Sequence, residues 1–462
     1  MDLLSRIDAA IEGCTDFLTQ LTMDLVNIKS VQSDPVPGGP FGAGVKQVLD
    51  FMLENGEKEG FYCKDHKMGV ATLALKDSTP DLGIWLHADV VPEGTGWKFE
   101  PYNATLYHGC IIGRGATDNK GQLAAMYLLL KIFRDLKIPL SYNPAIYIGS
   151  NEETGMADLV GDPNIPEAVG FLNVCTPPAL SLVPDSGFPV GYGGKGGMNI
   201  TLRSQTPLHS LHLVAGTPEA PGRATATYET DIYPDTLPGC TRSNRQIIAE
   251  TPPVHGAHPD PNGNMITVIS EALLPYADPQ DTYIFEFLRE ISRDIHGEGL
   301  GIAANFEYMP PLTVFTKSLS TEDGYVSVVL NIRYPYGITP DTITDKIREN
   351  IAKRGFEIAQ CTTGTPAYLL NPDSQVVQVL CEVANSVTGE DKKPYTLNGG
   401  TYGHRLPNAY PFGASAGQKP EDFPDGRGGA HGIDESVSLD RLKRAMRIYA
   451  RALLALDTIP WN

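Results

Sequence analysis

The sequence predicts an α/β protein with a mostly parallel central sheet, helices on both faces of that sheet, and an inserted α+β domain. In the first part of the chain, short apolar strands alternate with segments of helical apolar spacing. Segments that carry histidine and carboxylate side chains occur near both ends of the chain, and a region of different composition separates them. At 462 residues the chain is also too long for one ordinary hydrophobic core. We therefore expect one domain built from both ends of the chain and a second domain inserted between them.

Four apolar segments predict strands of the first domain, at residues 68–75, 83–86, 145–150 and 179–183. The segment 121–137 predicts a long helix, because Leu123, Met126, Leu130 and Phe133 recur at helical spacing. The first 25 residues predict a single amphipathic helix. Near the other end of the chain we expect helices over 374–389 and about 438–456, which return to the first domain.

The middle of the chain has a different texture. The glycine-rich segment GYGGKGGMN (191–199) lacks the GxxxxGK[ST] pattern of a phosphate-binding loop, and we interpret it as a flexible crossing between domains. Prolines between 207 and 253 predict a loop-rich region. It is followed by a helix over 280–295, a strand over 325–333 and a helix over 340–354 that Gly355 closes. The expected boundaries are 1–189 and 372–462 for the first domain and 190–371 for the inserted one.

The composition excludes several classes of function. With 36 Lys and Arg against 55 Asp and Glu, the net charge is −19, which argues against a nucleic-acid or anionic-membrane partner. No apolar run reaches the length of a membrane span, and the acidic N-terminus does not resemble a signal peptide. The seven cysteines are scattered and form no CxxC pair, so we expect reduced thiols and a cytoplasmic protein.

Five short segments contain side chains of the kinds that bind metals or transfer protons. The segments are LHADVVP with His87 and Asp89, GRGATDNKG with Asp118, SNEETG with Glu152 and Glu153, VPDSGFP with Asp185, and GGAHGIDE with His431. Four of them follow a predicted strand or stand at a turn before a helix, where the sites of open α/β sheets lie. Two imidazoles and three carboxylates suit two divalent ions, and two carboxylates remain for other tasks.

Each candidate also has an ordinary interpretation. His87 and Asp89, two apart at a strand end, point to the same side, so Asp89 can orient an imidazole ligand; a solvated turn is the alternative. Asp118 can span two ions with its two oxygens, or it can cap the following helix. Glu152 and Glu153 point in different directions on a turn, so one can bind metal while the other acts as a base; a pair of solvated loop acids is the alternative. A lone histidine such as His431 is more often structural than a ligand. The nitrogen and oxygen donors fit zinc, and also manganese or cobalt.

Together these motifs resemble the co-catalytic zinc metallopeptidase family of aminoacylases, glutamate carboxypeptidases and carnosinases. The resemblance runs through almost the whole chain and implies a two-domain fold with a lid. The implied ligands are His87 and Asp185 for one ion, Glu153 and His431 for the other, and Asp118 as the bridge between them. It further implies that Glu152 is the general base, that Asp89 orients His87, and that the Asp118–Asn119 peptide is cis.

Three further segments resemble the bacterial monomeric branch of Xaa-His-type dipeptidases. LNIRYPYG (330–337) implies that Arg333 grips the substrate carboxylate, and GAHPDPNGN (256–264) implies that His258 stabilises the oxyanion. NGGTYGHRLPN (398–408) implies that Gly400 and Thr401 line the substrate end. This last segment departs from the branch, because His404 stands where that branch has an arginine, with Arg405 beside it.

The implied function is hydrolysis of unblocked dipeptides, Xaa-His or of broad specificity, by a metal-activated water whose proton Glu152 removes. The first alternative is a deacylase of N-acyl amino acids that uses the same dinuclear site. The second is a non-catalytic homologue that binds metal or peptide. We expect a monomer, in which the inserted domain reaches the site of its own chain, with a dimer as the alternative.

Overall fold

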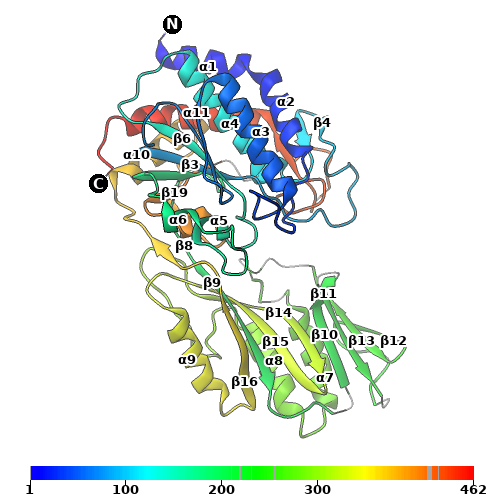
Figure 1. Ribbon diagram of the computed structural model, residues 1–462. Coiled ribbons are helices and arrows are strands. Elements are labelled where there is room, and N and C mark those ends of the chain that lie inside the picture. Colours follow the sequence, from blue (N-terminus) through cyan, green and yellow to red (C-terminus); the bar gives the residue numbers. More distant parts are fainter. Residues whose placement is uncertain are drawn as a thin grey trace. The chain divides into compact units, whose positions relative to one another are not determined.

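The computed structural model of the chain divides into two compact units (Figure 1). It describes residues 2–209, 211–217, 220–229, 232–252, 256, 259–261, 263–413, 419–424 and 426–461. Unit 1 comprises Met1–Gly193, Leu370–Tyr395 and Thr401–Asn462, and unit 2 comprises Gly194–Leu369 and Thr396–Gly400. Strands β8 (Gly191–Gly194), β17 (Tyr368–Leu369) and β18 (Tyr395–Leu397) lie where the chain passes from one unit to the other.

The core of unit 1 is a six-stranded sheet in the order β1-β2-β6-β3-β7-β19. Its strands are β1 (Tyr62–Asp65), β2 (Ala71–Ala74), β3 (Leu82–His87), β6 (Pro144–Gly149), β7 (Leu180–Val183) and β19 (Ala409–Pro411). The last four strands run parallel to one another, whereas β1 and β2 are antiparallel additions at one flank. The predicted mostly parallel sheet is confirmed.

Helices cover both faces of this sheet, as predicted (Figure 1). The larger apolar cluster joins one face to six helices: α1 (Leu3–Gly13), α2 (Thr15–Val26), α3 (Ala43–Glu59), α4 (Gly121–Asp135), α10 (Gln375–Thr388) and α11 (Leu439–Leu456). On the other face Trp85 and Tyr147 pack with the short helices α5 (Ala157–Val160) and α6 (Phe171–Val174). Residues alternate between the two clusters along β3 and β6, as strand geometry requires.

The N-terminal prediction of one helix is wrong, because α1 and α2 are separated at Cys14. The helix predicted over 340–354 is also shorter, since α9 (Pro340–Ile351) ends before Gly355. No helix in the described part of the chain is long and apolar enough to cross a membrane.

Unit 2 contains an eight-stranded antiparallel sheet in the order β12-β13-β11-β10-β14-β15-β9-β16. Its strands are β9 (Gly196–Ser204), β10 (Leu211–Thr217), β11 (Ala220–Tyr228), β12 (Cys240–Ser243), β13 (Gln246–Glu250), β14 (Thr313–Glu322), β15 (Tyr325–Tyr334) and β16 (Phe356–Thr363). One apolar cluster joins the sheet to α7 (Met265–Leu273), α8 (Thr282–Arg293) and α9. This α+β architecture is the one predicted for the inserted domain.

Two predictions for this middle region need correction. The segment 191–199 does contain the crossing between the units, at Gly193–Gly194, but it is not a loop, since it forms β8 and the start of β9. A side chain at Gly196 would collide with the Tyr334 ring, and one at Gly197 with the Arg333 guanidinium, so these glycines permit close packing against β15. The proline-rich region contains β10 to β13: the prolines at 207, 234, 238 and 252 stand outside the strands, and Pro221 stands at the start of β11.

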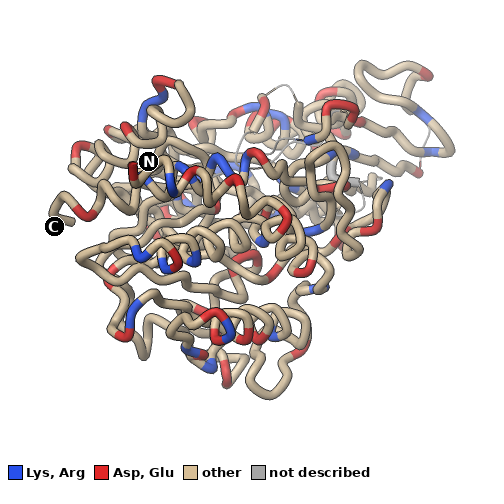
Figure 2. Tube along the Cα trace, turned by 90° about the horizontal axis from the view of Figure 1, so that it is seen from above, with Lys and Arg blue, Asp and Glu red and all other residues tan. Residues whose placement is uncertain are grey.

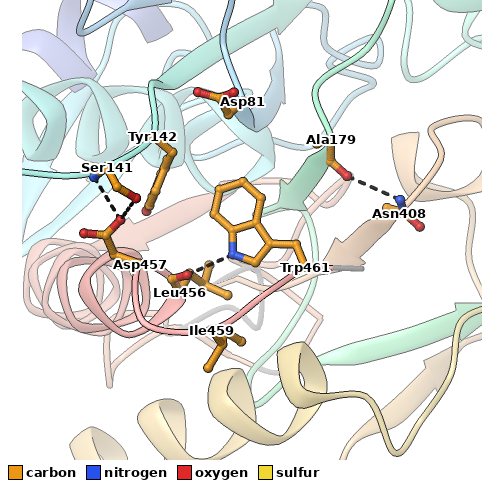
Figure 3. Close-up of a pocket in the computed structure, with 9 residues that line it drawn as sticks. All are labelled: Asp81, Ser141, Tyr142, Ala179, Asn408, Leu456, Asp457, Ile459 and Trp461. Carbon is orange, nitrogen blue, oxygen red and sulfur yellow. Dashed lines mark hydrogen bonds between the residues drawn. The ribbon is translucent and has the colours of Figure 1, made fainter.

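The amino ends of the parallel strands form one rim of the sheet in unit 1, which we call the amino-end rim. The final residues of the chain close it around a hollow of about 510 Å³ (Figure 3). The Trp461 indole N–H donates to the Leu456 carbonyl at 2.9 Å, and its ring packs edge-on against Tyr142. Asp457 accepts a hydrogen bond from the Ser141 amide at 2.9 Å. This rim holds the chain terminus against the sheet.

Candidate metal centre

The opposite rim, at the carboxyl ends of the parallel strands, collects most of the predicted site residues. His87 is the last residue of β3, Glu152 and Glu153 follow β6 after two intervening residues, and Asp185 follows β7. Asp118 lies in the turn Ala116–Lys120, directly before α4. His431 precedes β20 (Ser436–Ser438), which pairs with β5 (Cys110–Ile112) and so brings the C-terminal segment toward the Asp118 turn. We call this the carboxyl-end rim.

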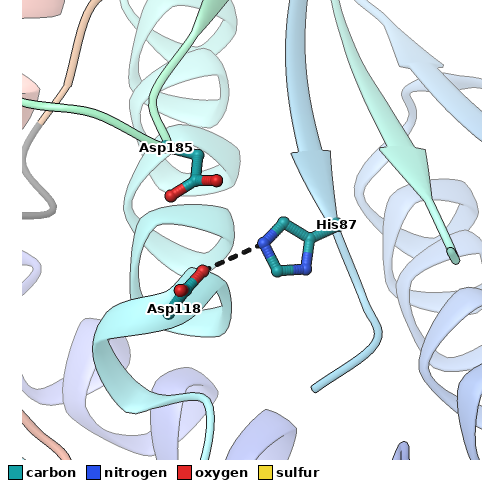
Figure 4. Close-up of side chains that lie close together, drawn as sticks. All are labelled: His87, Asp118 and Asp185. Atoms are coloured by element: carbon teal, nitrogen blue, oxygen red, sulfur yellow. Dashed lines mark hydrogen bonds and ion pairs between the residues drawn. The ribbon is translucent and has the colours of Figure 1, made fainter. Parts of the chain in front are cut away.

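Two groups of side chains at this rim can hold metal ions, and both contain Asp118. One group is His87, Asp118 and Asp185 (Figure 4), and the other is Asp118, Glu153 and His431. Within each group the potential ligand atoms all lie within 4.8 Å of one another. The two oxygens of Asp118 face different imidazoles: Oδ1 lies 3.0 Å from His87 Nε2, and Oδ2 lies 3.1 Å from His431 Nε2. We call these five residues the metal cluster.

The electrostatics of the metal cluster show an excess of buried negative charge. Burial raises the pKa of Asp185 to about 7, and the charge of Asp118 adds to the shift. Burial, together with Asp185, also raises the pKa of Glu152 well above its ordinary value. Hydrogen bonds to Asp118 and Glu153 raise the pKa of His431 to about 11. Divalent cations bind carboxylate oxygens and imidazole nitrogens, and a bound cation would neutralise the surplus negative charge. The residues therefore fit metal ions.

The imidazole of His87 is fixed from both sides. Its Nδ1 lies 3.0 Å from the Asp89 carbonyl and 3.5 Å from the Asp89 carboxylate. That carboxylate also accepts hydrogen bonds from the amides of Glu152, at 3.2 Å, and Glu153, at 3.0 Å. Asp89 therefore ties the strand end of His87 to the turn that carries both glutamates, a second contact that sequence reasoning did not anticipate. The Asp118–Asn119 peptide is cis, as the resemblance implied.

Glu435 is a supporting residue that sequence reasoning missed. Its buried carboxylate accepts hydrogen bonds from the amides of Thr117, at 3.0 Å, and Asp118, at 2.9 Å, and it pairs with Arg114 Nη1 at 2.6 Å. It therefore holds the turn that presents Asp118. The neighbouring Asp434, also buried, accepts hydrogen bonds from two backbone amides of the segment 98–99. A charged pair inside two separate motifs, GRGATDNKG and GGAHGIDE, was the signal available in the sequence.

The residues predicted to bind substrate are divided between the two units. Arg333 lies on β15 of unit 2, where burial lowers its pKa and its Nε has no hydrogen-bond partner among the described residues. Gly400 belongs to unit 2 and Thr401 to unit 1. Thr401 is buried and accepts a hydrogen bond from the Gly403 amide, while the ring of His404 faces the Thr401 amide at 3.2 Å. His258 lies outside the described residues.

A mostly parallel sheet whose carboxyl-end rim gathers imidazoles and carboxylates around one shared aspartate is the arrangement expected of a metal-dependent hydrolase. Residues 84–455 match the sequence profile of Peptidase family M20/M25/M40. The chain belongs to this family, and the predicted family resemblance is confirmed.

Individual known proteins are similar over nearly their whole length. The chain is 26% identical to a Bacillus subtilis (strain 168) protein provisionally named dipeptidase YtjP, over 94% of this chain and 96% of that protein. Human carnosine dipeptidase 1 superposes with a TM-score of 0.61 at 16% identity, covering 99% of this chain and 100% of that one. The dipeptidase Dug1p of Saccharomyces cerevisiae gives a TM-score of 0.61 at 13% identity, covering 99% of each chain. These structural likenesses show the shared fold.

Proposed function

We propose that the protein is a metal-dependent dipeptidase that hydrolyses unblocked dipeptides with two divalent ions, zinc being favoured over manganese or cobalt. The observation that carries the proposal is the position of Asp118, whose two carboxylate oxygens face the two imidazoles of the metal cluster separately. A carboxylate that belongs to both ligand groups suits a pair of ions about 3.5–4 Å apart. The dipeptidase names of similar proteins support the substrate class.

In this proposal His87 and Asp185 hold one ion, Glu153 and His431 hold the other, and Asp118 is shared. When bound, the ions lower the pKa of a water molecule and polarise the scissile carbonyl. Glu152 belongs to neither ligand group, and it removes the proton of the attacking water and later delivers it to the leaving amine. Asp89 keeps His87 and the Glu152 turn in register through its contacts with both.

Unit 2 supplies the substrate contacts in this proposal, as a lid domain inserted into the catalytic domain. Arg333 binds the C-terminal carboxylate of the dipeptide, because its buried guanidinium offers an Nε–H without a protein partner among the described residues. His258 stabilises the oxyanion, and Gly400 and Thr401 line the substrate end. A lid that binds the substrate carboxylate accepts peptides of limited length, which favours dipeptides over longer chains.

We further propose a cytoplasmic enzyme that works as a monomer. All seven cysteines are free, which suits a reducing compartment. Every member of the metal cluster comes from one chain, so the metal centre needs no partner subunit.

The test is a hydrolysis panel on metal-stripped protein to which zinc, manganese or cobalt is returned. The panel contains free dipeptides, including Xaa-His, together with tripeptides and N-acetyl amino acids. We expect metal-dependent cleavage of the dipeptides and little cleavage of the others. Cleavage of N-acetyl amino acids alone would replace the dipeptidase by a deacylase, and no turnover with two ions bound would refute the enzyme assignment for these substrates.

A further inference from the structure

A second group of reactive side chains lies in unit 1, among residues outside the metal cluster. Cys175 directly follows α6, and its Sγ lies 3.7 Å from Nδ1 of His66. The other ring nitrogen of His66, Nε2, lies 2.8 Å from the Oγ1 of Thr72 on β2. A thiol in contact with an imidazole, and a third side chain that orients the imidazole, is the arrangement that activates a nucleophile.

The imidazole is held in this position by its surroundings. Its ring packs edge-on against Phe171, with the ring centroids 5.1 Å apart, and Thr72 is buried. Burial lowers the pKa of His66 to about 4, with a smaller contribution from Lys64, so the ring is neutral at neutral pH. When the Thr72 hydroxyl donates its hydrogen to Nε2, the neutral ring carries its own hydrogen on Nδ1 and can donate it to the thiolate of Cys175.

These side chains open onto a cavity of about 810 Å³. This volume lies within the range of small-molecule sites, about 300–1,000 Å³. Tyr147 and Phe171 contribute aromatic wall, and Lys64 and Lys76 contribute two positive charges against one negative charge from Asp77. The cavity therefore suits a small, partly apolar molecule that carries carboxylates.

We propose that Cys175 is a modification site, which exchanges with a small disulfide carrying carboxylates while the Nδ1–H group of His66 stabilises its thiolate. The thiol proton passes to water, and the resulting thiolate attacks one sulfur of the disulfide. The bond from Cys175 Sγ to that sulfur forms as the original disulfide bond breaks. The departing thiolate takes a proton from water, so the exchange consumes only the disulfide and leaves a mixed disulfide in the cavity.

Other cysteines of the chain provide internal controls. Cys361 is exposed, and its Sγ contacts the hydroxyl of Thr344 at 3.7 Å, so it reports the reactivity of an accessible thiol beside a hydroxyl. Cys110 is buried and reports whether the protein remains folded. Cys63 also borders the cavity, but its Sγ lies near Gly56 and Leu73, and burial raises its pKa to about 11.

The experiment treats the full chain with oxidised glutathione at pH 7.5 and follows each cysteine by peptide mass spectrometry. We expect Cys175 to form its mixed disulfide at least ten times faster than Cys361. His66→Gln should lower the Cys175 rate about tenfold and leave the Cys361 rate unchanged. A Cys175 rate no greater than that of Cys361, or one that His66→Gln does not alter in folded protein, would overturn the proposal.

Two further measurements test the role of Thr72 and the preference for carboxylates. Thr72→Val keeps the imidazole but removes the group that orients it, so we expect the Cys175 rate to fall less than it does in His66→Gln. In both variants, an unmodified Cys110 shows that the fold is intact. Cystamine is a disulfide that carries two amines and no carboxylate. The ratio of the Cys175 rate to the Cys361 rate should therefore be smaller with cystamine than with oxidised glutathione. An equal or greater preference with cystamine would refute the carboxylate part of the proposal.

Discussion

Acidic side chains stand at both rims of the sheet in unit 1, but their partners differ. At the amino-end rim, Asp81 accepts a hydrogen bond from the Asn143 amide at 2.8 Å and Asp457 accepts one from the Ser141 amide at 2.9 Å, and no imidazole lines the hollow there. At the carboxyl-end rim, buried carboxylates face one another and two imidazoles. Backbone amides satisfy the first set, whereas the second set retains surplus charge for a cation. The partners of an acid, more than its presence, separate a structural rim from a reactive one.

Among the described residues, the charged side chains outside the metal cluster form no competing site of this kind. Lys and Arg are scattered among Asp and Glu along the chain (Figure 2), and most of the ion pairs are formed by partly exposed side chains. Exposed pairs of this type contribute about 0–1 kcal/mol each. The two groups of the metal cluster are the candidate metal sites found among the described residues.

The largest effect that would break the comparison is loss of Asp118. In the wild type, the two carboxylate oxygens of Asp118 serve the two ion sites, and Asp118→Asn leaves only one oxygen for both. We therefore expect the metal content to fall and the rate of hydrolysis to drop about a thousandfold or more. Metal content is measured by elemental analysis and hydrolysis by the dipeptide assay. Asp81→Asn, at the amino-end rim, is the matched control and should leave both unchanged. Full metal content in Asp118→Asn would contradict a shared ligand.

The two adjacent glutamates of the carboxyl-end rim have different proposed roles, Glu152 as the base and Glu153 as a metal ligand. Glu152→Gln should lower kcat by about a thousandfold and keep the metal content, because general acid–base catalysis contributes roughly 10²–10⁴ and Glu152 belongs to neither ligand group. Glu153→Gln should instead lose metal, since Glu153 belongs to one group with Asp118 and His431. Elemental analysis and kcat of the two variants decide the assignment. If both variants lost metal equally, Glu152 would be a ligand and not the base.

The parts of the site that the sequence predicted are those that local patterns mark. Apolar strands that stop at His87, or just before Asp185, are visible as short runs, and parallel strands bring their carboxyl ends to one rim. Glu435 depends instead on a contact with Arg114, 321 residues away, and no local pattern reports a contact of that range. The strands β10 to β13 were missed because prolines between them resemble prolines within a loop.

Glu435 tests whether the carboxyl-end rim is stabilised by a buried ion pair. Glu435→Gln leaves the buried Arg114 guanidinium without its anionic partner, and we expect the free energy of unfolding to fall by about 3 kcal/mol. Metal affinity should fall tenfold or more, since Glu435 holds the Asp118 amide. Urea unfolding and metal titration measure the two effects. Glu421→Gln, at an exposed position of the same C-terminal segment, is the control; equal stability of the two variants would refute the role.

His66 sharpens the contrast between imidazoles beside carboxylates and imidazoles without a bonded carboxylate. Although burial alone lowers the pKa of His87, hydrogen bonds to Asp118 and Asp89 raise it well above its ordinary value, whereas burial lowers the pKa of His66 to about 4. Between pH 4 and about 6.5 the unfolded chain therefore binds the His66 proton more readily than the folded chain. Stability should fall as pH decreases through this window, by about 1–2 kcal/mol after allowance for partial exposure. Urea unfolding of wild type and His66→Gln, compared at pH 7 and pH 4.5, isolates this contribution, and an identical pH dependence of both proteins would contradict it.

The smallest effect belongs to the amino-end rim. Asp457→Ala removes the acceptor for the amide and hydroxyl of Ser141, and the terminal segment loses about 1 kcal/mol of stabilisation because those donors can turn to water. Asp457→Asn keeps a carbonyl acceptor in the same place and should retain most of that stability. Neither variant should change metal content or kcat, because no member of the metal cluster lines this hollow. A fall in metal content would mean that the two rims are coupled through the strands β3, β6 and β7. The contrast between a rim that stabilises the chain terminus and a rim that binds cations would then fail, since a hydrogen bond at one end of a strand would be setting the ligand geometry at the other.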